Sequence, residues 1–331
     1  MRFNLSSISY NTIIIPSRYS LELLELRQMQ KILVTGANSF VGKHLVPFLN
    51  SKGYEVQGTA RREESLSVPP NRKLTSYRPN LVGDLSDENF LKNVKWKPDI
   101  IVHLAANSNL SSNLSKMVRD NISAVLHLTT FAEQVNCSKI IALSTISVHG
   151  QIYNQKISEN TGFVNPDTYG LTKRVGEILF QQNESISSSY ILRLPAILGV
   201  GASKHWISKV LASAIEGKVI NIYNPKNMFN NAIYLMDLLH FIEELFGRCE
   251  MGVFTFPLAS TEPISISKVV ELIVEESKSN SKIIQSKQNQ ASFTIDDSYA
   301  RDFFSFKSLN ISSAIRNYVE DTRLYTDYYG E

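Results

Sequence analysis

The chain has 331 residues, of which 43% are hydrophobic and 20% are charged, so it is long and apolar enough for a large α/β core with or without a smaller lobe. Its formal net charge is only +3 and its lysines and arginines are spread out, which argues against nucleic acid or an anionic membrane as a partner. No apolar run approaches the roughly 20 residues that span a bilayer. The two cysteines, Cys137 and Cys249, give no metal-ligand spacing and suit a reducing compartment, so we expect no metal site and a cytoplasmic protein.

Residues 1–28 are expected to be an N-terminal extension. Their apolar run at 13–15 is too short for the hydrophobic region of a secretory signal, and Glu22 and Glu25 argue against an organelle-targeting sequence. Met29 directly precedes the first predicted strand, so the folded core is expected to begin there.

Residues 31–45 predict a strand, a tight turn and a helix. Gly36 lies in the turn, the helix begins near Ser39, and Gly42 falls in its first turn. The amides at a helix start and the positive end of its dipole can hold a pyrophosphate, while the two glycines allow the turn and the close packing of helix on strand. Ser39 stands where the usual pattern has its middle glycine. On this pattern alone, a plain strand-to-helix turn is as good an explanation as a nucleotide site.

A second strand is predicted at 54–59, and it ends at Ala60, Arg61 and Arg62. In dinucleotide-binding folds this strand tip meets the adenosine ribose, where an acidic residue binds the 2′-hydroxyl and an arginine accommodates a 2′-phosphate. The tip has arginines and no acidic residue, which favours NADP(H) over NAD(H). A solvated charge pair is the alternative interpretation.

The next two strands are also followed by residues suited to a ligand. After a polar loop at 63–73, a third strand ends at Asp84 and Leu85, where an adenine would lie, although Asp84 can equally cap a short helix. A buried strand at 100–104 precedes the small residues Ala105 and Ala106, which let a ligand approach the backbone.

Two later segments carry candidate catalytic groups. A long helix is predicted at 114–134, and a fifth strand at 139–150 becomes hydroxyl-rich near Thr145, at the end of the sheet where ligands bind. Tyr169 and Lys173 are four residues apart and share a helix face. A nearby ammonium is expected to lower the pKa of a phenol toward the working range of a general acid or base.

Taken together, these motifs resemble the extended short-chain dehydrogenase/reductase family, which includes nucleotide-sugar epimerases, dehydratases and ketoreductases. The matching pieces, over residues 30–325, are TGANSFVG, GDL, HLAA, STISVHG, YGLTK and LRLPAILG. The resemblance implies an α/β fold with a Rossmann-like doubly wound parallel sheet and a smaller C-terminal substrate-binding lobe. The dinucleotide-binding domain would comprise 29–194, with 231–256 returning to it, and 195–331 would mainly form the substrate-binding lobe. A homodimer formed through two helices of each subunit is also implied.

The resemblance assigns roles to individual residues. Tyr169 would be the catalytic acid/base, Lys173 would lower its pKa and bind the nicotinamide ribose, and Thr145 would hydrogen-bond the substrate oxygen. The remaining cofactor-binding residues would be Gly36, Asn38, Ser39, Phe40, Val41, Gly42, Arg61, Arg62, Asp84, Leu85, Leu104, Ala105, Ala106 and Asn121. Residues that would contact the substrate are Ser147, His149, Ala196, Lys204 and His205.

Departures from the family pattern narrow the reaction. Ile146 and Ser147 replace the Asp-Glu pair with which 4,6-dehydratases eliminate water, and neither side chain can act as that acid and base. Asn230 and Asn231 stand where Arg-Asp is common, so the substrate diphosphate would be held elsewhere.

The favoured function is an NADP(H)-dependent reductase of a nucleotide-linked 4-keto-6-deoxy sugar, with hydride delivered to C4 and Tyr169 as the acid. An NAD-dependent nucleotide-sugar 4-epimerase is the first alternative. A sensor or scaffold that binds the dinucleotide without catalysis is the second.

Overall fold

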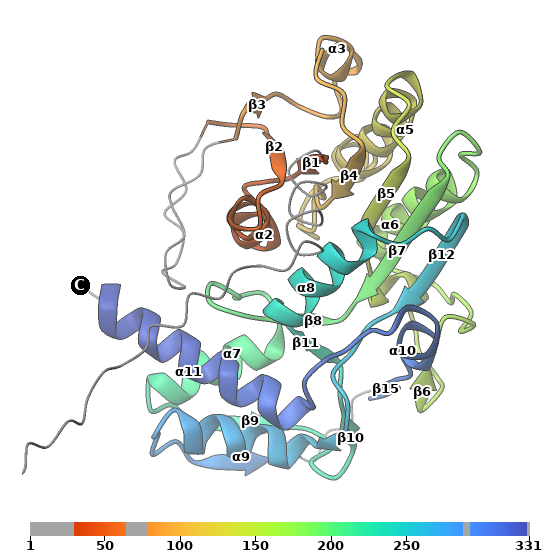
Figure 1. The fold of residues 1–331 in the computed structure, drawn as a ribbon. Helices are drawn as coiled ribbons and strands as arrows, with labels where there is room; N and C mark the ends of the chain where they lie inside the picture. Colours follow the sequence, from red (N-terminus) through yellow and green to blue (C-terminus); the bar gives the residue numbers. More distant parts are fainter. Residues whose placement is uncertain (1–29, 64–78, 287–291, 330–331) are drawn as a thin grey trace, which may run out of the picture.

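Seven parallel strands form one sheet in the order β12-β7-β5-β4-β1-β2-β3 (Figure 1). They are β1 (Lys31–Thr35), β2 (Glu55–Ala60), β3 (Leu81–Val82), β4 (Ile100–His103), β5 (Lys139–Thr145), β7 (Ser188–Leu194) and β12 (Gly252–Pro257). The strand order reverses between β1 and β4, which is the kind of switch point where open α/β sheets bind ligands. The predicted doubly wound parallel sheet is confirmed.

The structure is a computed structural model that describes residues 30–63, 79–286 and 292–329. The expected N-terminal extension at 1–28 and nearly all of the predicted loop at 63–73 lie outside the described residues. Within the part of the chain that is described, no helix combines the length and the apolar composition that a membrane span requires.

Helices cover both faces of the sheet because successive strand residues point to opposite sides. In β1, Ile32 and Val34 join a core with α2 (Phe40–Ser51) and α8 (Leu235–Phe246). Leu33 between them faces the other way, into a second core built with helices of the opposite layer. These are α3 (Glu88–Lys92), α5 (Ala124–Gln134) and α6 (Thr168–Gln181).

The helix predicted at 114–134 is interrupted. It begins as α4 (Leu114–Val118), widens into the π-helical turn η1 (Arg119–Ser123) and continues as α5. A π-helical turn accommodates an additional residue per turn and occurs often at functional sites. Here it coincides with two buried polar residues, Asp120 and Asn121, each of which has a partner outside this helix, Arg61 and Thr172 respectively.

A second lobe lies below the sheet in the view of Figure 1. It has its own apolar core. Its main helices are α7 (Trp206–Ile215), α9 (Ile266–Glu276) and α11 (Ile311–Tyr329). Short strand pairs complete the structure, namely β8 (Ala196–Leu198) with β11 (Ala232–Tyr234), β9 (Ile220–Ile222) with β14 (Ile283–Gln285), β10 (Met228–Phe229) with β13 (Ile264–Ser265), and β6 (Lys156–Ile157) with β15 (Thr294–Ile295). The short helix α10 (Ser298–Phe304) packs near β12.

One segment differs from the prediction. The charged and polar composition of residues 277–290 predicts an exposed linker, but β14 lies within them and pairs with β9. All three residues of β14, Ile283 to Gln285, pair with β9, and Ile283 is the most buried of them. Residues 287–290 lie outside the described part of the chain.

Candidate active site

The turn between β1 and α2 has the geometry of a pyrophosphate cradle. Gly36 has φ +69°, and a Cβ on it would lie 2.8 Å from the backbone of Ala105. A Cβ on Gly42 would lie 2.4 Å from the carbonyl oxygen of Gly36, so both positions require glycine. Ser39 has φ −69° and caps α2 by accepting a hydrogen bond from the Gly42 amide at 3.1 Å, which explains why the missing glycine is tolerated. The first amides of a helix have no partner within it, so this turn fits an anionic ligand.

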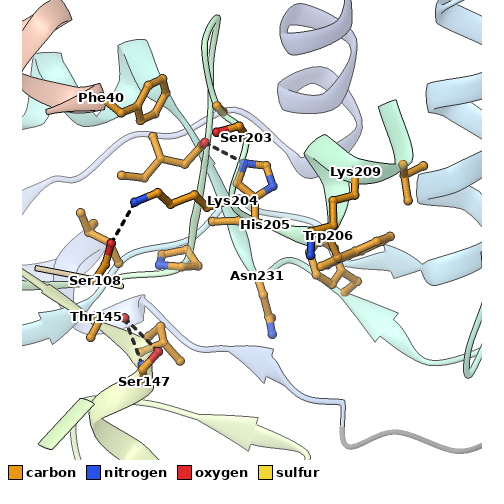
Figure 2. Close-up of a pocket in the computed structure, with 18 of the residues that line it drawn as sticks. Phe40, Ser108, Thr145, Ser147, Ser203, Lys204, His205, Trp206, Lys209 and Asn231 are labelled. Atoms are coloured by element: carbon orange, nitrogen blue, oxygen red, sulfur yellow. Dashed lines mark hydrogen bonds between the residues drawn. The ribbon is translucent and has the colours of Figure 1, made fainter. Parts of the chain in front are cut away.

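A cleft of about 1420 Å³ runs from this turn, past the ends of β5 and α6, into the second lobe. Most of the predicted site residues line it, namely Asn38, Ser39, Phe40, Val41, Leu104, Ala106, Thr145, Ser147, Tyr169, Lys173, Ala196, Lys204 and His205. Figure 2 labels five of them, Phe40, Thr145, Ser147, Lys204 and His205. The cradle and the three predicted catalytic residues therefore share one cleft.

Thr145 is the last residue of β5, and its hydroxyl is placed by a local turn. The strand predicted at 139–150 in fact ends here, because residues 146–149 form the 3-10 turn η2 (Ile146–His149). The Thr145 Oγ1 accepts a hydrogen bond from the Ser147 amide at 3.2 Å and lies 3.2 Å from the Ser147 hydroxyl (Figure 2). The turn thus brings two hydroxyl groups to the wall of the cleft.

Tyr169 and Lys173 project from the first two turns of α6, which Asp167 caps through a 2.7 Å hydrogen bond from the Gly170 amide. Burial lowers the pKa of Lys173 to about 8, although the nearby Glu177 carboxylate opposes this shift. Burial, followed by the Asp167 charge, raises the pKa of Tyr169 to about 12. The expected lowering of the Tyr169 pKa by Lys173 is wrong for this structure, in which burial and the Asp167 charge both raise that pKa. The phenol therefore keeps its proton at neutral pH.

Asn121 does not line the cleft but ties two parts of its wall together. Its side chain accepts a hydrogen bond from the Asn107 amide at 2.6 Å and donates to the Asn107 carbonyl at 3.0 Å. It also donates to the Thr172 hydroxyl on α6 at 2.9 Å. With these partners it holds the loop after β4 against the helix that carries Tyr169.

The β2 tip is organised around a neighbouring carboxylate. The Arg61 guanidinium lies 3.3 Å from the buried carboxylate of Asp120, which Lys116 and Arg119 also contact. Arg62 contributes its carbonyl oxygen to a hydrogen bond from the Asn38 amide group. Neither arginine lines the cleft.

Asp84 and Leu85, the other predicted adenine contacts, also lie outside the cleft wall. Asp84 accepts hydrogen bonds from the amide and hydroxyl of Ser86, at 2.9 and 2.8 Å. The cap of α3 is Asp87 and not Asp84. Leu85 is buried in the core beneath α5, and its carbonyl contacts His127.

The two predicted substrate histidines have local structural partners. His149 is 1% exposed, stacks on Phe163, and does not line the cleft. His205 lines the cleft but also caps α7 by accepting from the Ser208 amide at 3.2 Å. Burial lowers the pKa of both imidazoles, so both are neutral at pH 7.

Glu177, a buried carboxylate on the same helix as Tyr169 and Lys173, was not identified from the sequence. Glu177 on α6 accepts hydrogen bonds from Ser144 at 2.5 Å and from Arg193 at 3.0 and 3.1 Å. It is four residues after Lys173, so the helical spacing from Tyr169 through Lys173 to Glu177 was the available signal. Ser108 was also missed. It lines the cleft and accepts a hydrogen bond from Lys204, but no motif in the sequence indicated it.

The charged side chains on the cleft wall are positive. Three lysines line it, Lys173, Lys204 and Lys209, and no aspartate or glutamate belongs to its wall among the residues that the structure describes. An anionic ligand is therefore favoured.

Comparison with known proteins agrees with this geometry. Residues 32–243 match the model of the NAD dependent epimerase/dehydratase family. The chain is 27% identical over 263 residues to the uncharacterized UDP-glucose epimerase YtcB of Bacillus subtilis (strain 168), a match that covers 73% of this chain and 81% of that protein.

Two solved structures share the fold. MoeE5 in complex with UDP-glucuronic acid and NAD superposes with a TM-score of 0.72 at 22% identity, over 89% of this chain and 99% of that one. A UDP-glucose 4-epimerase superposes with a TM-score of 0.75 at 19% identity, over 90% of this chain and 98% of that one. Because the family match extends over well more than half of the sequence, the chain belongs to the NAD-dependent epimerase/dehydratase family, a group of NAD(P)-dependent extended short-chain dehydrogenase/reductase enzymes.

Proposed function

We propose that this protein is an NADP(H)-dependent reductase that acts at C4 of a nucleotide-linked 4-keto-6-deoxy sugar. The observation that carries the proposal is that Thr145, Tyr169 and Lys173 line one cleft with the cradle at the start of α2. A non-catalytic dinucleotide binder has no need of that arrangement.

The proposed chemistry divides among three side chains. When bound, the nicotinamide cofactor supplies the hydride. The Tyr169 phenol donates its proton to the oxygen of the sugar carbonyl as negative charge develops there. The Thr145 hydroxyl holds that oxygen in line, and the Lys173 ammonium stabilises the phenolate that remains. Holding the reacting groups in fixed positions supplies much of the rate.

One observation supports reduction over epimerisation. The β2 tip has Ala60 and Arg61 where NAD-binding members usually have an acidic residue, and an arginine at this tip favours a cofactor with a 2′-phosphate. In this structure the Arg61 guanidinium pairs with Asp120, so a 2′-phosphate would have to compete with that carboxylate.

The 4-epimerase remains the second candidate, because UDP-sugar epimerases are prominent among the similar proteins. Identification of the dinucleotide that copurifies with the protein separates the two. Exchangeable NADP(H), together with oxidation of NADPH by a nucleotide-linked 4-keto-6-deoxy sugar, supports the reductase. Stoichiometric, tightly held NAD with no net NADPH consumption would overturn it in favour of the epimerase.

The substrate is proposed to be a nucleotide diphosphate sugar. MoeE5 is described with UDP-glucuronic acid bound, and the cleft of this chain has lysines and no described carboxylate on its wall. The negative charge of a diphosphate would balance the positive charge of these lysines. Asn230 stands at the position where members of the family commonly have an arginine. Its amide group donates hydrogen bonds to the carbonyl oxygens of Ser260 and Ile295.

We further propose a cytoplasmic homodimer. Both cysteines are free thiols, which suits a reducing compartment. On the outer faces of α5 and α6, Leu126, Leu171 and Ile178 are 49%, 48% and 37% exposed. A second copy of the same helix pair would cover this apolar surface.

A further inference from the structure

The loop that enters the second lobe, residues 199–204, lies against the start of α2. A Cβ on Gly199 would lie 3.4 Å from the Phe40 ring, and one on Gly201 would lie 3.9 Å from it. The carbonyl oxygen of Val200 lies 3.2 Å from the His44 Nε2 atom, one turn further along α2. We call residues 199–204 the strap.

The strap contacts the second lobe through Ala202, and the residues on either side of it contact each other. Within the strap, the Ala202 amide donates to the Gly199 carbonyl at 3.0 Å, and the Ala202 carbonyl accepts from the Tyr318 hydroxyl of α11 at 3.4 Å. His205 directly follows it, with Nε2 3.1 Å from the Ile197 carbonyl oxygen. The strap is therefore bound to the second lobe on one side and contacts the start of α2, next to the cradle, on the other.

Lys204 extends from the strap across the cleft. Its ammonium donates to the Ser108 hydroxyl at 3.1 Å, on the loop that follows β4. In Figure 2 the lysine side chain lies between Phe40, at the helix start, and Thr145. Among the described residues it has no carboxylate partner, and the cleft wall provides none.

Lys204 is exposed and lines the same cleft as Ser39 and Phe40 at the start of α2, so its ammonium and the positive end of that helix would both favour an anion placed between them. The anion that belongs at the start of α2 is the pyrophosphate of the dinucleotide. We infer that Lys204 is a ligand of the cofactor pyrophosphate and not of the substrate diphosphate, so that the second lobe completes the cofactor site. This inference rests on the proposed dinucleotide-dependent function, and it changes the expected role of Lys204 from a substrate contact to a cofactor contact.

Binding measurements on the full chain test the inference without turnover. ADP-ribose carries the pyrophosphate of the cofactor but no nicotinamide, and UDP represents the substrate side. In titration calorimetry, Lys204→Met is expected to weaken ADP-ribose binding by about tenfold or more, because a charge-assisted hydrogen bond is lost, and to leave UDP binding within about twofold. Lys204→Arg keeps the charge and is expected to retain most of the ADP-ribose affinity.

Lys209→Met is the matched control. Lys209 lines the same cleft from α7, beside Trp206 and further from Phe40 (Figure 2). Its loss should leave the ADP-ribose affinity within about twofold, since it lies away from the cradle. Matching thermal unfolding midpoints establish that the variants are folded.

Two results would overturn the assignment. One is an unchanged ADP-ribose affinity in Lys204→Met, and the other is a loss of UDP affinity with ADP-ribose binding intact. If the wild-type protein binds UDP but not ADP-ribose, the proposed function itself fails. These failures are therefore distinguishable.

Discussion

Arg193 and Glu177 form a buried, two-pronged ion pair in which Nε lies 3.1 Å from Oε1 and Nη2 lies 3.0 Å from Oε2. Their side chains are 3% and 1% exposed. Arg193 is at the carboxyl end of β7, and its register partner on β5, Ser144, donates to the same carboxylate. The pair therefore fixes α6, with Tyr169 and Lys173, over two central strands.

Glu177→Gln should be strongly destabilising, since it leaves the Arg193 guanidinium buried without its counter-charge. We expect a loss of about 3–5 kcal/mol in the free energy of unfolding, measured by denaturant titration. Glu276→Gln is the control, because the ion pair of Glu276 with Arg316 is largely exposed and should contribute at most about 1 kcal/mol. Equal losses in the free energy of unfolding for the two substitutions would show that the buried pair contributes no more to stability than the exposed one.

Tyr169→Phe removes the proposed acid but keeps the ring in its place on α6. Turnover of a nucleotide-linked 4-keto-6-deoxy sugar with NADPH is expected to fall on the order of 100-fold or more, with the ADP-ribose affinity nearly unchanged. Tyr153→Phe, at a tyrosine that is 78% exposed, should leave turnover unaffected. Unchanged turnover in Tyr169→Phe means that another group supplies the proton.

Lys173→Met should abolish turnover but increase stability at neutral pH. The folded-state pKa of Lys173 is about 8 against an ordinary value of 10.5, so burial opposes its charged form. Below pH 8 this penalty is fully present, and it amounts to up to about 3 kcal/mol. Between pH 8 and 10.5 the folded state releases its proton before the unfolded state does, so the wild type gains stability relative to the variant. Unfolding titrations at pH 7 and pH 10.5 should therefore show the advantage of Lys173→Met shrinking, and an advantage that is constant with pH would contradict the assigned shift.

Features that depend on neighbouring residues were predictable from the sequence. The glycine spacing after β1 correctly indicated the tight turn, and the spacing of Tyr169 and Lys173 correctly indicated that they lie one turn apart on a helix. Features that depend on distant partners were not. The partner of Arg61 is Asp120, 59 residues away, and the partner of Lys204 is Ser108, 96 residues away.

Burial is the other quantity that local sequence does not report. The Tyr169 pKa was expected to fall because Lys173 is one turn away, but how far each side chain is removed from water depends on the whole fold. The same holds for His149, which packs between other side chains instead of reaching the cleft.

Leu171→Glu tests the proposed homodimer. The residue is 48% exposed on α6 beside the apolar surface of α5, so a carboxylate there would be buried without a partner in a symmetric contact. Light scattering should give the mass of two chains for the wild type and of one for the variant. Leu324→Glu, on the exposed face of α11 at 48% exposure, is the control and should remain dimeric. A monomeric wild type at micromolar concentration contradicts this contact.

Gly36→Ala and Gly217→Ala form a matched pair that isolates the cradle geometry. Gly36 has φ +69° and Gly217 has φ +66°, so both substitutions incur the same left-handed backbone strain of about 1–2 kcal/mol. They differ in surroundings, because a Cβ at Gly36 lies 2.8 Å from the Ala105 backbone, whereas one at Gly217 meets nothing within 4 Å. Gly36→Ala must therefore push the turn after β1 away from Leu104 and Ala105, which follow β4, and it should lose about 1–3 kcal/mol more stability than Gly217→Ala. ADP-ribose affinity should fall at least tenfold in Gly36→Ala and stay unchanged in Gly217→Ala, and similar effects of both on binding would mean that the anion seat lies elsewhere.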